Sequence, residues 1–322
     1  MKQAIFEASV LLQNDLFGRK NIIFFNKQPQ IGKEGELMRI EKVGVLGAGI
    51  MGRGIAQVCA MGGFNVTMQD INDEILTKSL SIIEQNLQKG IERGKVKPEE
   101  KEAALSKIKL VTSIEAAAKE ADLVIEAVPE NLKLKQNVFS EVEKYCSPHT
   151  IIASNTSSMS VTEIGAAVRS PERTIGLHFF NPVHIMKLVE IVCGLETSAE
   201  TFNACEVACQ QMGKQTVKIN EYPGFVTTRI NALIGNEAFT MLQEGLGSPE
   251  DIDKALKLGL NHPMGPFEMV DLVGLDTRLK ILEYLHQTLG EKYRPAPLMV
   301  KYVKAGRLGR KVGKGVYDYS AK

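Results

Sequence analysis

The distribution of apolar residues from about residue 38 onwards predicts alternating strands and helices. Short runs typical of buried strands occur at residues 43–46, 64–69, 122–128, 150–154, 173–178 and 188–192. Between them lie stretches with helical spacing, the clearest at about residues 50–60 and 132–145. Because strand–helix alternation places parallel strands in one sheet with helices on both faces, we expect an α/β fold with a Rossmann-like, doubly wound, mainly parallel sheet.

Composition and charge narrow the class of protein. The 322 residues are 44% hydrophobic and 24% charged, which excludes disorder, collagen and coiled coil as the main state and suggests about two domains. The 39 basic and 38 acidic side chains leave a formal charge of +1. Because nucleic-acid binding needs a basic surplus, no nucleic-acid partner is expected. No run of about 18 apolar residues is present, so no membrane partner is expected either.

The cysteines indicate a reducing compartment. They are five in number and form no CxxC pair, so we expect free core thiols and a cytoplasmic location. Cys205 and Cys209 share an expected helix face, but no histidine lies near them in the sequence. We therefore expect no metal site.

Residues 1–37 differ from the rest of the chain. Their mixed charges and scattered Phe and Gln fit neither a transit peptide nor a signal peptide. One interpretation is that translation naturally starts at Met38, because Lys33-Glu34-Gly35-Glu36 can be encoded by a purine-rich stretch resembling a bacterial ribosome-binding site. The other is a genuine appendage that pairs with another subunit.

A glycine-rich turn follows the first expected strand. The stretch Gly47-Ala48-Gly49-Ile50-Met51-Gly52 opens a helix, and a second strand delivers Asp70, 18 residues after the third glycine. This context predicts a dinucleotide site. Gly47 allows the tight turn, Gly49 lets a pyrophosphate approach the backbone, and Gly52 lets the helix pack closely on the strand. The helix N-terminus, with Ile50 and Met51, would hold the phosphates.

Asp70 bears on the choice of cofactor. Its carboxylate would accept hydrogen bonds from a ribose diol and would repel a 2′-phosphate, which favours NAD over NADP. The alternative is a purely structural glycine turn with Asp70 as a helix cap.

His178 and Glu190 are the strongest catalytic candidates. His178 ends an expected strand, and Glu190 lies inside the apolar run 187–192. A buried carboxylate is costly unless it is paired, and a histidine on the neighbouring strand would pair it while gaining basicity. Such a pair beside a nicotinamide suits the oxidation of an alcohol, in which a base takes the hydroxyl proton. His184, six residues from His178, is the competing base.

Short polar side chains follow another strand end, in Asn155-Thr156-Ser157-Ser158. Ser157 can donate a hydrogen bond to a substrate oxygen. The alternative is that this segment caps a helix, because Ser and Thr are favoured at N-caps. Glu126 and Pro129-Glu130-Asn131 also fall at or beyond a strand end, where ligands bind in doubly wound sheets.

Together these motifs resemble 3-hydroxyacyl-CoA dehydrogenases, in particular the short, single-function 3-hydroxybutyryl-CoA dehydrogenase type. The likeness covers Met38 to about Tyr319 and includes several motifs in the right order: 47–54, 128–131, 153–158, 176–182, 186–190, 223–226 and 262–276.

The resemblance implies roles for individual residues. His178 would be the general base, Glu190 its orienting carboxylate, and Ser157 the group that binds the 3-oxygen of an L-3-hydroxyacyl-CoA substrate. The groups that would contact the nicotinamide half of NAD are Glu130, Lys135, Asn181 and Lys311.

The resemblance also implies a second, all-helical domain and a homodimer formed through it. The expected organisation is an NAD-binding domain over 38–221 and a helical substrate and dimerisation domain over 222–322. The residue pattern agrees, because after Pro223-Gly224 it becomes helical at 225–246, 249–257 and 267–286, and strands cease until the short tail.

The chain departs from the family pattern at two positions. Thr228 stands where the family commonly has an Asn that contacts substrate, and Asn231 lies one helical turn further on. His184 stands where a proline is usual. For the CoA phosphates, Arg93 lies in a local basic cluster with Lys89, Lys95 and Lys97, although the pattern favours a solvated helix end over a phosphate site.

The leading hypothesis is therefore an NAD-dependent oxidoreductase acting on short 3-hydroxyacyl-CoA, in fatty-acid breakdown or in the reverse, biosynthetic direction. Two alternatives remain: a dehydrogenase of free hydroxy acids on the same scaffold, and a dinucleotide-binding relative without catalysis. Phe179-Phe180 counts against the first. The catalytic residues count against the second.

Overall fold

The structure is a computed structural model that describes residues 11–14, 20–23 and 38–320. The chain divides into two compact units, Met1–Leu37 and Met38–Lys322. In the first unit, strand β1 (Leu11–Asn14) pairs antiparallel with β2 (Lys20–Ile23). Both interpretations of residues 1–37 concern a segment that lies mostly outside the described residues, and they stay predictions.

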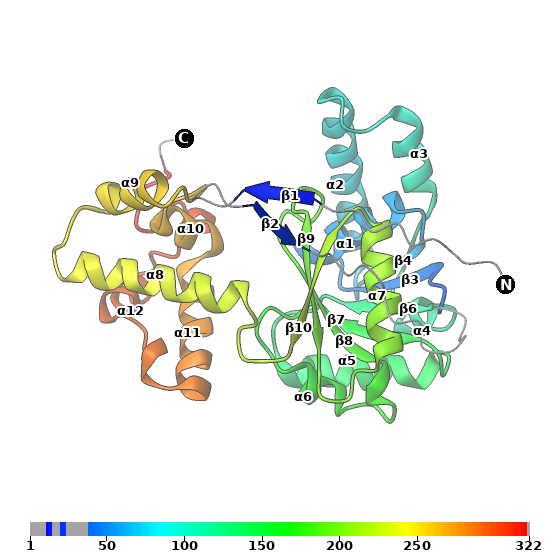
Figure 1. Cartoon of the computed structure of the whole chain (residues 1–322). Coiled ribbons are helices and arrows are strands. Elements are labelled where there is room, and N and C mark those ends of the chain that lie inside the picture. Colours follow the sequence, from blue (N-terminus) through cyan, green and yellow to red (C-terminus); the bar gives the residue numbers. More distant parts are fainter. Residues whose placement is uncertain (1–10, 15–19, 24–37, 321–322) are drawn as a thin grey trace. The chain divides into compact units, whose positions relative to one another are not determined.

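The second unit contains an eight-stranded sheet with the order β10-β9-β8-β7-β6-β3-β4-β5 (Figure 1). Neighbouring strands are parallel except β8 and β9, which are antiparallel. The strands are β3 (Lys42–Leu46), β4 (Asn65–Gln69), β5 (Ile108–Val111), β6 (Leu123–Glu126), β7 (Ile151–Ser154), β8 (Thr174–Phe179), β9 (Leu188–Cys193) and β10 (Gln215–Asn220). The predicted doubly wound, mainly parallel sheet is confirmed.

Two strands of this sheet, β5 and β10, are absent from the sequence-based expectation. Both are edge strands, and neither has a fully buried residue. The prediction relied on continuous apolar runs, which occur in central strands buried on both faces. These edge strands contain lysines and have solvent-exposed positions between the apolar ones, so the continuous apolar run is missing.

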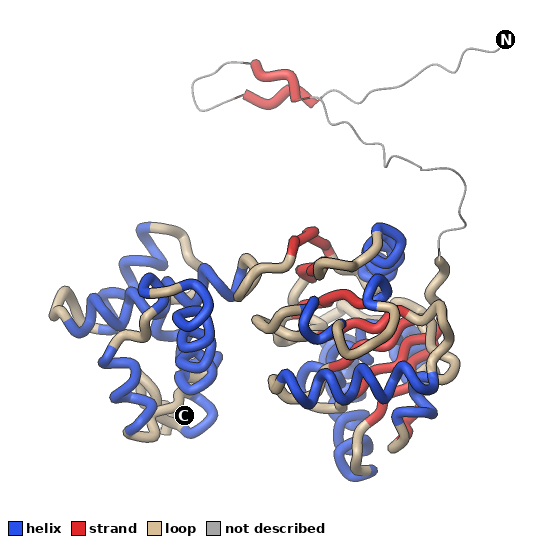
Figure 2. Tube along the Cα trace, turned by 90° about the horizontal axis from the view of Figure 1, so that it is seen from below, coloured by secondary structure: helices blue, strands red, loops and turns tan. Residues whose placement is uncertain are grey.

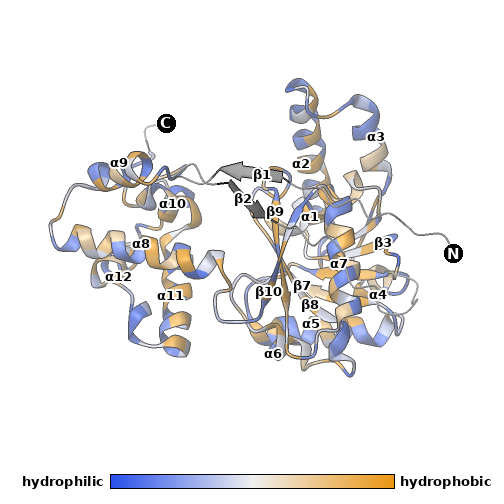
Figure 3. Cartoon of the chain, in the orientation of Figure 1, coloured by the Kyte–Doolittle hydropathy of each residue, from blue (hydrophilic) through white to orange (hydrophobic). Residues whose placement is uncertain are grey.

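Helices cover both faces of the sheet, as Figure 2 also shows. One face packs against α1 (Ile50–Met61), α2 (Asp73–Glu92), α3 (Pro98–Ser106) and α7 (Ala199–Gln211). The other packs against α4 (Ile114–Ala118), α5 (Leu132–Tyr145) and α6 (Val161–Gly165). In Figure 3 the helices mix orange and blue, as expected for helices with one buried face. The bounds of α5 are those predicted.

The remaining helices form what we call the helical lobe: α8 (Thr227–Gln243), α9 (Pro249–Gly259), α10 (Pro266–Val273), α11 (Leu275–Leu289) and α12 (Pro297–Lys304). Its core is separate from the cores of the sheet and centres on Phe239. The ring of Phe239 meets Phe267 at 5.3 Å and Tyr302 at 5.5 Å, both edge to face. The predicted helical C-terminal region is thus confirmed, while the boundary at residue 222 stays a prediction.

Two details of the helical lobe differ from expectation. The single helix expected over 267–286 is two helices, because Gly274 adopts φ +101°, a conformation that L side chains rarely adopt and that ends α10. The tail has isolated bridges at Gly309–Lys314 and Lys314–Asp318 instead of a strand. Among the described residues, no helix combines the length and the apolar character needed to cross a bilayer.

Candidate active site

The candidate site lies at one edge of the sheet, beyond the carboxyl ends of β3, β6, β7 and β8. These four strands are consecutive in the sheet and run parallel. The loops that leave their carboxyl ends therefore meet at the same edge. Strand β9 runs the other way, which brings its amino end to the same edge. The site therefore collects residues far apart in the sequence, and each one is positioned by a strand end.

The glycine-rich turn has the backbone that the motif predicts. Gly47 adopts φ +90°, and a Cβ atom there would lie 2.9 Å from the carbonyl oxygen of Ala127. A Cβ at Gly52 would lie 1.6 Å from the carbonyl oxygen of Gly47, so no other residue fits that position. Around Gly49, by contrast, nothing lies within 4 Å of the Cβ position. The turn is closed on the protein side and open on the side where a ligand would approach.

The first turn of α1 offers unpaired donors at this opening. Gly49 is the N-cap, no side chain caps the helix, and its first turn contains no acidic residue. The N–H groups of Ile50, Met51 and Gly52 have no intrahelical acceptor, because the first N–H groups of any helix have none. Together with the helix dipole, they form an anion-binding surface. These residues fit the pyrophosphate of a dinucleotide.

Asp70 follows β4, the strand that pairs with β3. Its carboxylate accepts hydrogen bonds from the N–H groups of Ala48 (2.7 Å) and Ile71 (2.8 Å), and the residue is half-buried. The alternative reading of Asp70 as a helix cap is wrong, because α2 is capped by Asn72, which accepts from the N–H of Glu74 at 2.6 Å. Asp70 instead ties the second strand to the glycine turn, beside the expected position of a ribose.

His178 and Glu190 form a buried pair. They are directly opposite each other in the antiparallel β8–β9 register. The imidazole Nδ1 lies 2.7 Å from Glu190 Oε2, and the residues are 5% and 0% exposed. Because Nδ1 is engaged with the carboxylate, Nε2 is the ring nitrogen left for chemistry. The predicted partnership between these two side chains is what the geometry shows.

The surroundings of the pair favour the ionised form of the Glu190 carboxylate. Burial raises the pKa of Glu190, but hydrogen bonds from His178 and Thr227 outweigh it, and the net pKa lies below its usual value. Thr227 donates from its backbone N–H (3.0 Å) and its hydroxyl (3.1 Å). The imidazole packs against the rings of Phe180 and Phe225, with centroid distances of 4.4 and 5.8 Å. Glu190 is thus an anion that holds one tautomer of His178.

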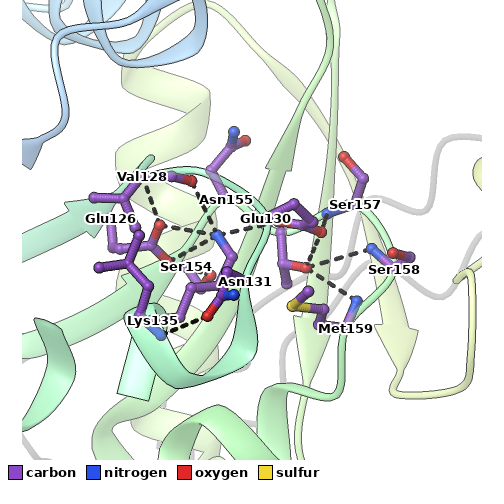
Figure 4. A network of polar contacts seen from close by, with 12 residues as sticks. Glu126, Val128, Glu130, Asn131, Lys135, Ser154, Asn155, Ser157, Ser158 and Met159 are labelled. Carbon is purple, nitrogen blue, oxygen red and sulfur yellow. Dashed lines mark hydrogen bonds and ion pairs between the residues drawn. The ribbon is translucent and has the colours of Figure 1, made fainter. Parts of the chain in front are cut away.

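A second group of buried charges lies at the ends of β6 and β7 (Figure 4); we call it the Glu126 network. Glu126 is 0% exposed and accepts from Ser154 Oγ (2.6 Å), the N–H of Val128 (2.7 Å) and Lys135 Nζ (2.9 Å). The same ammonium lies 3.1 Å from Glu130 Oε2. The network thus links a buried carboxylate to one at the surface of the site.

Glu130 in turn fixes the segment after β7. Its Oε1 accepts from the hydroxyl of Thr156 (2.6 Å) and the N–H of Ser157 (3.0 Å). The carboxamide oxygen of Asn155 accepts from the N–H of Phe179 at 2.9 Å, which ties the same segment to the end of β8 beside His178. Ser157 does not cap a helix, because α6 is capped by Ser160. Its half-buried hydroxyl donates no hydrogen bond within the described residues.

The expected contact between Lys135 and a nicotinamide does not fit this geometry. The side chain of Lys135 is 1% exposed, and its ammonium is already bonded to Glu126, Glu130 and the carbonyl oxygen of Val128. Its position in the first turns of α5, where lysines usually face solvent, hides this burial from sequence reasoning. Lys135 holds Glu130 in place instead of reaching a ligand itself.

The other expected site residues lie less centrally. Lys311 belongs to the helical lobe, where its ammonium contacts both Asp276 oxygens at 2.5 and 2.6 Å. Asn181 is exposed in the loop after β8, and Arg93 is exposed at the C-cap of α2. Within the described residues, none of these three side chains is hydrogen-bonded to the His178–Glu190 pair or to the Glu126 network.

One further expectation concerns the segment near Glu190. Thr228 is half-buried in the first turn of α8, next to Thr227, and the structure gives its hydroxyl no contact with Glu190. Thr227 is the residue that sequence reasoning missed. Its signal was weak: it follows Gly224 and Phe225, both with positive φ (76° and 49°), in a turn that brings the start of α8 to β9.

The last group of candidates is the metal-ligand and thiol side chains of the described residues. Within the part of the chain that the structure describes, no group of three or more His, Cys, Asp or Glu side chains is arranged to hold a metal ion. All five cysteines are free. Burial raises the pKa of Cys209 to about 12 and that of Cys205 well above its usual value, so these thiols are inert core residues.

Comparison with known proteins agrees with this reading. Residues 42–222 match the family model described as 3-hydroxyacyl-CoA dehydrogenase, NAD binding domain, and residues 224–319 match 3-hydroxyacyl-CoA dehydrogenase, C-terminal domain. A probable 3-hydroxybutyryl-CoA dehydrogenase of Bacillus subtilis is 47% identical over 286 residues, covering 88% of this chain and 99% of that protein. A 3-hydroxybutyryl-CoA dehydrogenase of Bradyrhizobium diazoefficiens is 45% identical over 281 residues, covering 87% and 96%.

Solved structures give the same picture. The crystal structure of (S)-3-hydroxybutyryl-CoA dehydrogenase from Ralstonia eutropha superposes with a TM-score of 0.84 at 46% identity, covering 87% of this chain and 99% of that one.

Proposed function

This chain belongs to the 3-hydroxyacyl-CoA dehydrogenase family, and from that premise we propose that it oxidises L-3-hydroxybutyryl-CoA to acetoacetyl-CoA, reversibly, with NAD. The observation that carries the proposal is the 2.7 Å contact between His178 Nδ1 and Glu190 Oε2, at the sheet edge that also holds the glycine-rich turn. A paired, uncharged imidazole is the base that the oxidation of an alcohol requires.

His178 moves the proton in this mechanism. With Nδ1–H donated to Glu190, Nε2 accepts the hydroxyl proton of the substrate. The imidazolium that forms is stabilised by the Glu190 carboxylate, which three hydrogen bonds from His178 and Thr227 hold in its charged form. The glycine-rich turn and the start of α1 would hold NAD, which would supply the hydride acceptor for carbon 3. In the reverse direction, His178 returns the proton to the carbonyl oxygen.

Ser157 positions the substrate oxygen. Its backbone is held by Glu130, and Asn155 ties the same segment to the strand end that carries His178. We propose that the Ser157 hydroxyl donates a hydrogen bond to the 3-oxygen of the substrate. Donors fixed before the reaction stabilise developing charge on such an oxygen without reorganisation.

For the cofactor, we propose that the turn from Gly47 to Gly52 with Ile50 and Met51 holds the pyrophosphate, and that Asp70 binds the adenosine ribose. The open space at Gly49 and the uncapped start of α1 support this. Glu130 and Asn181 are proposed to lie against the nicotinamide half. Lys311 belongs to this set only if its ion pair with Asp276 opens.

The test is an assay with acetoacetyl-CoA and NADH, followed by the loss of absorbance of NADH. We expect turnover with the CoA ester, none with free acetoacetate, and a strong preference for NADH over NADPH. Turnover of the free acid alone would establish the hydroxy-acid alternative, and no turnover of either substrate with bound cofactor would establish the non-catalytic one. A series of acyl-CoA esters of increasing length then defines the chain-length preference.

We further propose that the acyl-CoA phosphates meet the basic cluster at Arg93 and that the protein works in fatty-acid metabolism in the cytoplasm. The exposed guanidinium of Arg93 supports the first proposal, and the free thiols suit a reducing compartment. Arg93→Ala should raise the KM for acetoacetyl-CoA and leave the KM for NADH unchanged. Equal effects on both would contradict the assignment.

A homodimer through the helical lobe is the remaining proposal. Large apolar side chains are exposed there, including Ile230 (54%), Leu246 (71%), Leu258 (76%) and Leu260 (67%). Covering these side chains with a second copy would remove apolar surface from water and so stabilise the assembly. Sedimentation at micromolar concentration should show a dimer.

A further inference from the structure

A loop of residues 180–187, which we call the site loop, connects the two members of the His178–Glu190 pair. It leaves β8 two residues after His178 and enters β9 two residues before Glu190. Within it, the N–H groups of Ile185 and Met186 both donate to the carbonyl oxygen of Pro182 at 2.9 Å, so the loop closes into a tight turn. Any shift of this turn moves the backbone on either side of the pair.

The side chain of Lys214 is hydrogen-bonded to this turn. The residue lies just before β10 and is 8% exposed, and its ammonium donates to the carbonyl oxygens of Val183 (2.5 Å) and Met186 (2.8 Å). Within the described residues it forms no ion pair. The titratable groups around it are the buried thiols of Cys59 on α1 and Cys209 on α7, and the imidazole of His184 on the loop itself.

A buried ammonium without a counter-ion is an expensive feature, which points to a task. Burial lowers the pKa of Lys214 below its usual value, as expected when a cation loses water and gains no anion. An apolar side chain of the same length would avoid this cost. An apolar side chain could not donate two hydrogen bonds to the carbonyl oxygens of Val183 and Met186, for which the described part of the chain offers no other donor.

The same turn also presses on the proposed cofactor helix. Val183 is 2% exposed, and a Cβ atom at Gly54 of α1 would lie 2.8 Å from its Cβ. The side chain of Val183 therefore packs against α1 while its carbonyl oxygen is held by Lys214. One residue thus connects the helix that would bind the dinucleotide to the loop that carries the imidazole–carboxylate pair.

We propose that Lys214 is a positioning residue that holds the site loop against α1 and so sets the placement of His178 relative to the cofactor. The inference rests on the proposed function and deepens it. Lys214 does not touch reacting atoms. It acts through Val183 and Met186, and its effect on the reaction is one of alignment.

The test replaces the ammonium by an apolar chain of equal length, Lys214→Met. We expect kcat/KM for acetoacetyl-CoA and NADH to fall about 10²-fold, the typical cost of a misplacement near 1 Å. Thermal stability should stay near that of the wild type, because a buried uncompensated charge is removed. Amide hydrogen exchange at Ile185 and Met186, measured without substrate, should become faster.

Two variants serve as controls. Lys218→Met lies on β10, where the exposed Lys218 covers the ring of Phe202 at 4.4 Å, and it should leave kcat/KM and loop exchange unchanged. Lys214→Arg keeps a cationic donor and should recover most of the lost rate and protection. If Lys214→Met does not fold, Lys214→Gln carries the same expectation.

Two results would overturn the proposal: a folded neutral variant with wild-type kcat/KM and wild-type loop exchange, or a folded Lys214→Arg that loses as much as Lys214→Met. An inactive wild type would count against the proposed function instead. The exchange measurement needs no substrate and still decides whether Lys214 holds the loop.

Discussion

Glu126 and Glu190 are both 0% exposed glutamates in neighbouring regions of one sheet, yet their partners differ in kind. Glu190 is paired with an imidazole, the side chain that moves the proton in the proposed reaction. Glu126 is paired with the ammonium of Lys135, a hydroxyl and an N–H group, none of which takes part in the proposed reaction. The first pair is built to exchange a proton, and the second is built to stay fixed.

The consequence of each pairing is visible one contact further out. Lys135 contacts both Glu126 and Glu130, and Glu130 accepts a hydrogen bond from the backbone of Ser157. Glu190 holds Nδ1 of His178 and so orients Nε2, the nitrogen that takes part in the proposed reaction. Both carboxylates thus position a group of the site, but only one of them lies next to a group that titrates during the proposed reaction. Substitutions should separate the two regions clearly.

The largest effect is expected for His178→Ala. Loss of a general base lowers kcat by about 10²–10⁴, while cofactor affinity should change little. The fold should survive, because Glu190 keeps two hydrogen bonds from Thr227. Steady-state kinetics with acetoacetyl-CoA and NADH measure this. His184→Ala is the matched control and should retain activity; a loss of similar size in that variant would transfer the role of base to His184.

Glu126→Gln should instead cost stability. It leaves the buried ammonium of Lys135 with one carboxylate at the edge of the site, and breaking a buried ion pair typically costs about 3–5 kcal/mol. Urea unfolding measures the change. Glu126→Gln combined with Lys135→Met should cost less than the two single variants together, because no charge is left unpaired. A loss below about 1 kcal/mol in the single variant would show that the network is not held by this pair.

These two regions also mark what sequence reasoning can and cannot reach. The His178–Glu190 pair was predictable, because a glutamate inside an apolar strand needs a partner and a histidine ends the preceding strand. The glycine turn and Asp70 were predictable for a similar reason, since each residue type there has one steric or electrostatic purpose.

The contacts that cross the chain were not predictable. Thr227 meets Glu190 from 37 residues away, and nothing in its local pattern distinguishes it from Thr228. The burial of Lys135 depends on Glu126 lying below it, which no helical periodicity reveals. The break at Gly274 was hidden because Val273-Gly274-Leu275 continues an apolar helical pattern, and only the backbone φ of +101° ends the helix.

A third carboxylate sharpens the comparison. Asp70 accepts hydrogen bonds from backbone N–H groups only and is half-buried, so it has no side-chain partner in the described residues and is free to bind a ligand. Asp70→Ala should raise the KM for NADH by about tenfold or more, the worth of hydrogen bonds to a charged group, and should relax the preference over NADPH. Kinetics with both cofactors test this. Unchanged selectivity would mean that another group reads the ribose.

The smallest effect is expected in the pH dependence of stability. The pKa of Glu190 is lower in the folded protein than its ordinary value of 4.5, so the ionised carboxylate favours the fold. This contribution is fully present above pH 4.5 and is lost as the pH falls through the lower, folded pKa. Glu190→Gln lacks it, so the difference in unfolding free energy between wild type and variant should shrink as the pH is lowered through this window.

Glu196→Gln, at an exposed glutamate in the loop after β9, is the matched control and should follow the wild type at every pH. A difference between the wild type and Glu190→Gln that grows on acidification would mean that burial outweighs the hydrogen bonds from His178 and Thr227. Glu190 would then be a carboxyl kept neutral by its surroundings, and the contrast with Glu126 would lie in the charge of the carboxylate itself instead of in the partner it meets.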